Sequence, residues 1–105
     1  METTVQTKDE IRERLNDLRS DLRRLGVKRL GLFGSFLADA QCEESDVDLL
    51  VEFEPGKKSF DRFMQLSFLL EKALRRRVEL VTREGLSPHL APHILREVAY
   101  VEVAD

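Results

Sequence analysis

The chain has 105 residues, 42% of them hydrophobic, which predicts a single compact domain over residues 1–105 with a modest core. Its 17 Lys and Arg and 20 Asp and Glu residues give a formal net charge of -3, which argues against general nucleic-acid binding through many phosphate contacts. No run approaches the roughly 20 apolar residues of a membrane span, and the N-terminus lacks the pattern of a secretion signal, so we expect a soluble, cytoplasmic protein.

The first predicted element is a helix between Thr7 and Gly26. Thr7 and Glu10 have the spacing of a capping box, in which each side chain bonds the backbone N–H of the other residue. The apolar residues that follow recur at alternating steps of four and three, as on one face of a helix: Ile11, Leu15, Leu18, Leu22 and Leu25. Gly26 can adopt positive φ and so end the helix. The pattern lasts only about two heptads, which favours a helix packed on a sheet over a coiled coil.

Two strands are predicted next, over residues 27–33 and 45–53, on either side of Gly34-Ser35. Residues 36–39 are expected to form one or two turns of helix, and residues 40–44 a polar loop. Alternation divides the second strand into an apolar face and a mainly acidic face. These faces consist of Val47, Leu49 and Val51, and of Asp46, Asp48, Leu50 and Glu52.

The C-terminal half predicts a second helix capped by Ser59, a third strand over Val78–Thr82 and an edge strand over Tyr100–Val103. Pro88 and Pro92 both suit the first turn of a short helix between the last two strands. This order of elements predicts an α/β (α+β) fold with a small mixed sheet of about four strands, covered mainly by helices.

Asp46 and Asp48 are the first candidate site residues. Because they are two residues apart on a strand, their side chains leave the same face from Cα atoms about 6.6 Å apart. Two such carboxylates can share one or two Mg²⁺ ions, which prefer oxygen ligands and leave positions open for substrate phosphates. The alternative is a solvated strand face, but like charges placed side by side among apolar residues call for a compensating cation.

Gly34-Ser35 is the second candidate site, for a phosphate. Glycine lets the backbone approach a phosphate closely, and the N–H groups at the start of the following helix would point toward it. The Ser35 hydroxyl adds a further donor. A Gly-Ser pair after a strand is by itself usually only a turn, so this prediction depends on the two aspartates that follow.

Glu79 is the candidate for a third carboxylate, on a neighbouring strand. It is the one acid within the apolar run Val78–Val81, where it would bind the metal and help to deprotonate an acceptor hydroxyl. The alternative is an ordinary surface-facing strand residue.

Two further features carry weaker signals. His89 and His93 are four residues apart, but Pro92 between them disfavours a helical metal site and leaves contact with a substrate or a partner as the functional alternative. Phe68-Leu69 widens the apolar face of the second helix beyond what one sheet needs, so it could supply a partner interface.

The pattern Gly34-Ser35-x10-Asp46-x-Asp48 resembles the signature of the DNA polymerase β nucleotidyltransferase superfamily. The whole chain, through Leu86–Pro88 and Ile94–Glu97, is similar to the smallest branch of that superfamily, the minimal nucleotidyltransferase (MNT) proteins. Members of this branch are antitoxins encoded beside HEPN-domain ribonuclease toxins. The resemblance implies a nucleotidyltransferase fold and a Mg²⁺-dependent transfer of AMP from ATP to a tyrosine hydroxyl of the HEPN toxin, an AMPylation that silences it.

The resemblance also implies a role for each site residue. By position, Gly34 and Ser35 would hold the triphosphate, while Asp46 and Asp48 would bind two Mg²⁺ ions. Glu79 falls at the third acidic position, where members of the superfamily more often have Asp.

The length of the chain bears on the acceptor. Larger nucleotidyltransferases carry extra domains that hold the acceptor, and 105 residues leave no room for one. We therefore expect an acceptor that brings its own positioning surface, namely a protein partner in a hetero-oligomer. Two alternatives stay open: an antitoxin that blocks the toxin by binding alone, and nucleotidyl transfer to a small molecule such as an antibiotic.

Overall fold

A computed structural model describes residues 5, 7–38, 40–42 and 45–103, and its strands form one mixed sheet in the order β3-β2-β1-β4. The strands are β1 (Val27–Phe33), β2 (Val47–Phe53), β3 (Val78–Thr82) and β4 (Ala99–Glu102). β1 is antiparallel to both β2 and β4, whereas β2 and β3 are parallel and are connected by helix α3 (Phe60–Leu74). The expected mixed sheet of about four strands is confirmed.

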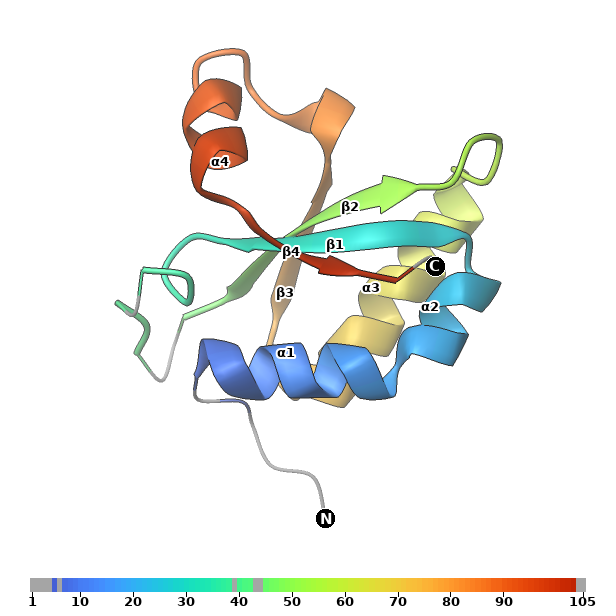
Figure 1. The fold of residues 1–105 in the computed structure, drawn as a ribbon, viewed down its shortest axis with the longest axis horizontal. Helices are drawn as coiled ribbons and strands as arrows, with labels where there is room; N and C mark the ends of the chain where they lie inside the picture. The colour runs from blue at the N-terminus through green and yellow to red at the C-terminus, as the bar shows by residue number, and fades with distance from the viewer. Residues whose placement is uncertain (1–4, 6, 39, 43–44, 104–105) are drawn as a thin grey trace.

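Helices lie on both sides of this sheet (Figure 1). The other helices are α1 (Lys8–Asp17), α2 (Arg19–Arg24) and α4 (Ala91–Glu97), and a 3₁₀ turn, η1 (Arg83–Gly85), follows β3. Helices α1, α2 and α3 lie on one side, while α4 lies on the other (Figure 1). Among the described residues, no helix is both long enough and apolar enough to cross a membrane.

The side of the sheet that faces α1, α2 and α3 holds the hydrophobic core. The buried strand residues on this side include Leu30, Leu32, Val47, Leu49 and Val51. The register pairs Leu32 with Leu49 and Phe33 with Asp48, so Phe33 and Asp48 lie on the opposite side, which faces α4. The predicted apolar face of the second strand is therefore confirmed, although Leu50 on the other face is also fully buried.

The N-terminal helical segment is broken, and the prediction of one continuous helix from Thr7 to Gly26 was wrong. Leu18, with φ -93° and ψ 4°, separates α1 from α2. The N–H of Leu22 still donates to the carbonyl oxygen of Leu18 (2.9 Å), so the apolar periodicity passes across the break without a change of phase. Because the periodicity is preserved, the break leaves no trace in the pattern of apolar residues.

Two expected boundaries near the site also differ. Residues 35–38 form a turn instead of the predicted helix, and Asp39 lies outside the described residues. The second strand begins at Val47 and not at Ser45, whose hydroxyl accepts a hydrogen bond from the N–H of Cys42 (2.8 Å). Asp46 consequently immediately precedes β2.

The ends of the later helices mostly agree with the predictions made from the sequence. Ser59 caps α3 by accepting a hydrogen bond from the N–H of Arg62 (3.1 Å), as predicted. Pro92 lies in the first turn of α4, but Pro88 lies in a separate turn before it, so only one of the two prolines starts a helix.

Candidate active site

Gly34 lies at the end of β1, directly beside the carboxylate of Asp48. Its φ of +78° is in the left-handed region that glycine adopts far more readily than other residues. A Cβ atom added to Gly34 would overlap Oδ2 of Asp48 and lie 2.9 Å from its Cγ. This position therefore requires glycine for two reasons, and the turn after β1 is in contact with one of the predicted metal ligands.

The chain continues in a turn over residues 34–38, here called the phosphate turn. The N–H of Ala38 donates to the carbonyl oxygen of Gly34 (3.2 Å), and the fully buried Phe36 anchors the turn in the core. Within the described part of the chain, the backbone N–H groups of residues 35–37 donate to no acceptor. Consecutive N–H groups of this kind can bind an anion even where no helix follows.

The three predicted carboxylates lie within electrostatic reach of one another. Asp48 and Glu79 are register partners on the parallel strands β2 and β3, and Asp46 immediately precedes β2. The pKa of Asp48 is raised from 3.8 to about 6, first by burial of its carboxyl group and then by the negative charges of Glu79 and Asp46. Asp46 and Asp48 are half-buried and Glu79 is exposed, so the third carboxylate is accessible from outside.

A divalent cation would suit these oxygen ligands, since it would offset the repulsion that raises the pKa of Asp48. In the residues that the structure describes, however, no three His, Cys, Asp or Glu side chains are grouped closely enough to hold a metal ion by themselves. Mg²⁺ is usually bound by one or two carboxylates together with waters and substrate phosphates. The residues thus fit a Mg²⁺ ion whose ligands are completed by a bound nucleotide.

Arg76 connects the two halves of this site. Its guanidinium donates hydrogen bonds to the carbonyl oxygens of Val5 (2.7 Å), Ser45 (3.0 Å) and Cys42 (3.3 Å). It also lies over the ring of Phe36, 5.0 Å from the centroid. One side chain therefore contacts both the phosphate turn and the residue that precedes Asp46.

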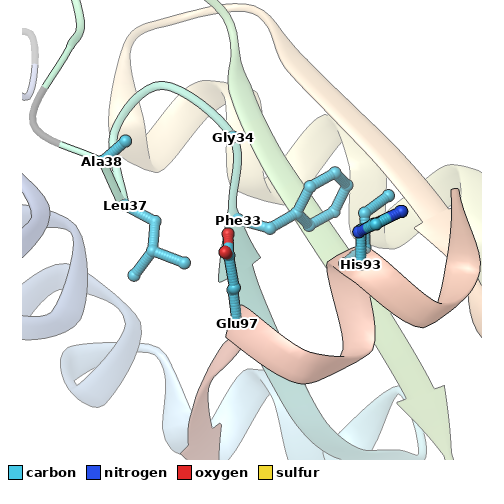
Figure 2. Close-up of a pocket in the computed structure, with 7 residues that line it drawn as sticks. Phe33, Gly34, Leu37, Ala38, His93 and Glu97 are labelled. Carbon is cyan, nitrogen blue, oxygen red and sulfur yellow. The ribbon is translucent and has the colours of Figure 1, made fainter.

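A pocket of about 520 Å³ opens beside the phosphate turn (Figure 2). One wall is formed by Phe33 at the end of β1 and by Gly34, Leu37 and Ala38 of the turn. The other wall is α4, which contributes His93, Ile94 and Glu97. Figure 2 shows the Glu97 carboxylate pointing from α4 toward the end of β1.

The pocket contains residues that sequence reasoning did not assign to the site. His93 lines the pocket, which is consistent with the predicted alternative of contact with a substrate or a partner, whereas His89 does not line it. Glu97 carried no signal of its own, because its position depends on how α4 folds back over β1. Its exposed, charged side chain is otherwise typical of the solvent face of a short helix.

Comparison with known proteins gives consistent matches over most of the chain. Residues 9–101 match the family model described as a nucleotidyltransferase domain. A protein of Thermococcus cleftensis named protein adenylyltransferase MntA is 42% identical over 96 residues, which cover 90% of this chain and 96% of that protein.

Solved structures agree with these matches. A structure described as a minimal nucleotidyltransferase has a TM-score of 0.78 and 34% identity, with 92% of this chain and 98% of that chain covered. A toxin–antitoxin structure with AMP-PNP has a TM-score of 0.67 and 23% identity over 85% of this chain and 70% of that chain. A complex of a tri-AMPylated Shewanella oneidensis HEPN toxin with an MNT antitoxin has a TM-score of 0.60 and 21% identity. The match covers 86% of this chain and 70% of that chain. The last two similarities show a shared fold.

Proposed function

The chain belongs to the nucleotidyltransferase domain family, and on this basis we propose that it is an antitoxin that transfers AMP from ATP to a tyrosine of a HEPN ribonuclease toxin. The observation that carries the proposal is the contact between Gly34 and Asp48, which, in the described part of the chain, joins a turn with unbonded backbone N–H groups to a group of carboxylates. The relatives support the chemistry and the partner, since one is named a protein adenylyltransferase and another is the antitoxin in a complex with an AMPylated HEPN toxin.

The phosphate turn would bind the triphosphate of ATP. The N–H groups of residues 35–37 and the Ser35 hydroxyl are donors that can bind phosphate oxygens. AMP-PNP in one of the similar toxin–antitoxin structures supports ATP as the donor.

Asp46 and Asp48 would hold Mg²⁺, which when bound supplies positive charge that offsets the negative charge developing on the phosphates. Glu79 is placed on the edge strand β3 and is exposed, so an acceptor brought by a partner can reach it. We therefore assign Glu79 the role of the base that accepts the proton of the acceptor hydroxyl.

The transfer is a displacement at the α-phosphorus. The phenolic oxygen of the acceptor tyrosine forms a bond to that phosphorus, while the bond from the phosphorus to the bridging oxygen breaks and pyrophosphate leaves. The phenolic proton passes to a carboxylate of the site, so atoms and charges balance. The contribution of this chain is positioning and electrostatic stabilisation, which supply most of the rate in such transfers.

Labelled ATP tests this proposal. With Mg²⁺ and the HEPN toxin, label at the α-phosphate should appear on the toxin and label at the γ-phosphate should not. Asp48→Asn should abolish the labelling while circular dichroism shows the fold retained. Transfer of the label by the double variant Asp46→Asn/Asp48→Asn would rule out the role assigned to these carboxylates.

A second candidate is an antitoxin that neutralises the toxin by binding alone. Two observations favour it: the described carboxylates form no ready three-ligand group, and Phe60 and Phe68 of α3 are 78% and 63% exposed, as in a surface that contacts a partner. This candidate predicts that the catalytic variants neutralise the toxin as well as the natural chain does.

A further inference from the structure

The pocket between the phosphate turn and α4 has the size and lining of a small-molecule site. Its volume of about 520 Å³ lies within the range of roughly 300–1,000 Å³ that is typical of ligand pockets. Apolar groups of Phe33, Leu37 and Ile94 line it, and Glu97 is the one acidic side chain among the described residues that line it. Gly34 belongs both to this pocket and to the phosphate turn, so the two sites are continuous.

The lining argues against phosphate as the occupant of the pocket. Phosphate sites offer several N–H groups or cations, whereas the described lining of this pocket is mainly apolar and adds only one imidazole, His93, and the acidic Glu97. The triphosphate is better accommodated at the N–H groups of residues 35–37, beside the pocket.

The lining also argues against the acceptor hydroxyl as the occupant of this pocket. An attacking hydroxyl has to lie beside the metal ligands, but none of Asp46, Asp48 and Glu79 lines this pocket. The pocket is therefore suited to a part of the nucleotide that does not react.

We propose that this pocket binds the adenine base of ATP, an inference that rests on the proposed function and extends it to recognition of the base. The ring packs between Phe33 and Ile94, as flat aromatic bases pack on apolar and aromatic side chains. The carboxylate of Glu97, which points into the pocket, accepts a hydrogen bond from the exocyclic amino group of adenine (Figure 2). A base with an oxygen in place of that amino group would bring its own acceptor oxygen close to the Glu97 carboxylate, with no hydrogen between them to form a bond.

Comparison of ATP with inosine triphosphate, in which an oxo group replaces the amino group, tests the role of Glu97. We expect the natural chain to prefer ATP by about tenfold or more in kcat/KM for transfer to the toxin, the scale of one hydrogen bond to a charged group. In Glu97→Gln the amide can donate to the oxo group, so the preference should fall toward one. Glu13→Gln, an exposed substitution on α1, is the matched control and should keep the full preference.

A second variant tests the location of the base independently of Glu97. Ala38 is exposed and lines the pocket, so Ala38→Leu should narrow the pocket while leaving the backbone bond to Gly34 unchanged. We expect weaker binding of ATP and of inosine triphosphate in calorimetric titrations with Mg²⁺ but without toxin. Inhibition of transfer by inorganic tripolyphosphate should stay unchanged, because that probe has no base.

The outcomes separate this inference from the proposed function. An unchanged ATP preference in Glu97→Gln, or a loss of tripolyphosphate inhibition as large as the loss of ATP binding in Ala38→Leu, would overturn the base site even if the natural chain labels the toxin. If the natural chain labels no toxin, the proposed function fails, and the calorimetric comparison of ATP with inosine triphosphate still decides whether the pocket binds adenine.

Discussion

The contact between Gly34 and Asp48 governs the site at the scale of single residues. The glycine provides a left-handed backbone and leaves space for the carboxylate, and the carboxylate in turn carries a pKa of about 6 because it is partly buried near two other acids. Sequence reasoning identified both residues from their spacing. It did not reveal that they touch, because this contact depends on the pairing of Phe33 with Asp48 across β1 and β2.

Replacement of Gly34 by alanine should damage activity more than stability alone explains. Gly34→Ala places a Cβ atom against the Asp48 carboxylate and forces alanine into a left-handed conformation, which costs about 1–2 kcal/mol. Gly56→Ala is a matched control, since Gly56 also has φ of +78° but nothing within 4 Å of an added Cβ. In urea denaturation Gly56→Ala should lower the free energy of unfolding by the cost of placing alanine in the left-handed conformation. Only Gly34→Ala should also lose transfer activity, by about 100-fold. Equal activity in the two variants would contradict the direct role of the contact.

The raised pKa of Asp48 predicts that, without metal, the charged Asp48 carboxylate lowers the stability of the folded protein at neutral pH. The folded protein retains the Asp48 proton up to about pH 6, whereas the unfolded chain loses it near 3.8, so stability should fall as the pH rises from about 4 to about 6 and stay lower above. Asp48→Asn removes this cost. After allowance for solvent screening of a half-buried group, we expect a gain of about 1 kcal/mol, or about 4–8 °C in Tm, at pH 7.5 in EDTA.

The pH series and the metal provide the controls for this prediction. The difference in Tm between Asp48→Asn and the natural chain should shrink as the pH falls from 6 toward 4. Mg²⁺ with ATP should raise the Tm of the natural chain and not that of the variant, because a ligand stabilises only the form that binds it. A natural chain more stable than Asp48→Asn in EDTA at pH 7.5 would contradict the account.

At the scale of elements, the site depends on loops held together by Arg76 as well as on the sheet. β2 and β3 place Asp48 beside Glu79, but Asp46 and the phosphate turn lie outside the strands. The bond from Arg76 to Ser45 and its contact with the ring of Phe36 fix these two segments relative to each other. The run Arg75–Arg77 directly follows α3, and nothing in a run of three arginines indicates which of them points inward.

Arg76→Gln should therefore loosen both segments at once. Loss of charged hydrogen bonds to three carbonyl oxygens should cost about 1–3 kcal/mol in urea denaturation. The Mg²⁺ concentration that gives half-maximal transfer should rise, because Asp46 is no longer held in place. Arg77→Gln is the neighbouring control: Arg77 is exposed and bonds Val47 only through its backbone oxygen, so its stability should change by about 0.5 kcal/mol or less. A similar effect of both substitutions would refute a positioning role for Arg76.

At the scale of the whole molecule, sequence reasoning predicted the sheet and its strands better than the segments between them. The strands Val27–Phe33 and Val78–Thr82 were predicted with their observed bounds, because short runs rich in apolar residues and bounded by glycine or arginine are strong signals. The break at Leu18 and the turn at residues 35–38 were missed, since a preserved periodicity conceals the first and local hydrogen bonds decide the second. The pocket was also missed, because it is formed by residues some 60 positions apart that meet only when α4 folds over β1.

The position of the carboxylates in the whole molecule also bears on which acceptor can reach them. Asp48 lies on β2 and Glu79 is exposed on the neighbouring edge strand β3, so the carboxylates can be reached by an acceptor from outside this domain. A protein partner that carries its own acceptor would complete such a site, which is the arrangement that the proposed function assigns to the HEPN toxin.

The intact mass of that toxin tests the central claim most directly. A HEPN-domain toxin, the partner that the proposed function assigns to this chain, would be incubated with the chain, ATP and Mg²⁺, and its mass and ribonuclease activity followed together. We predict that the mass rises by whole adenylyl groups on a tyrosine while ribonuclease activity falls in parallel, and that Asp46→Asn/Asp48→Asn prevents both changes. A toxin that is silenced equally well by both chains, with its mass unchanged, would contradict the account.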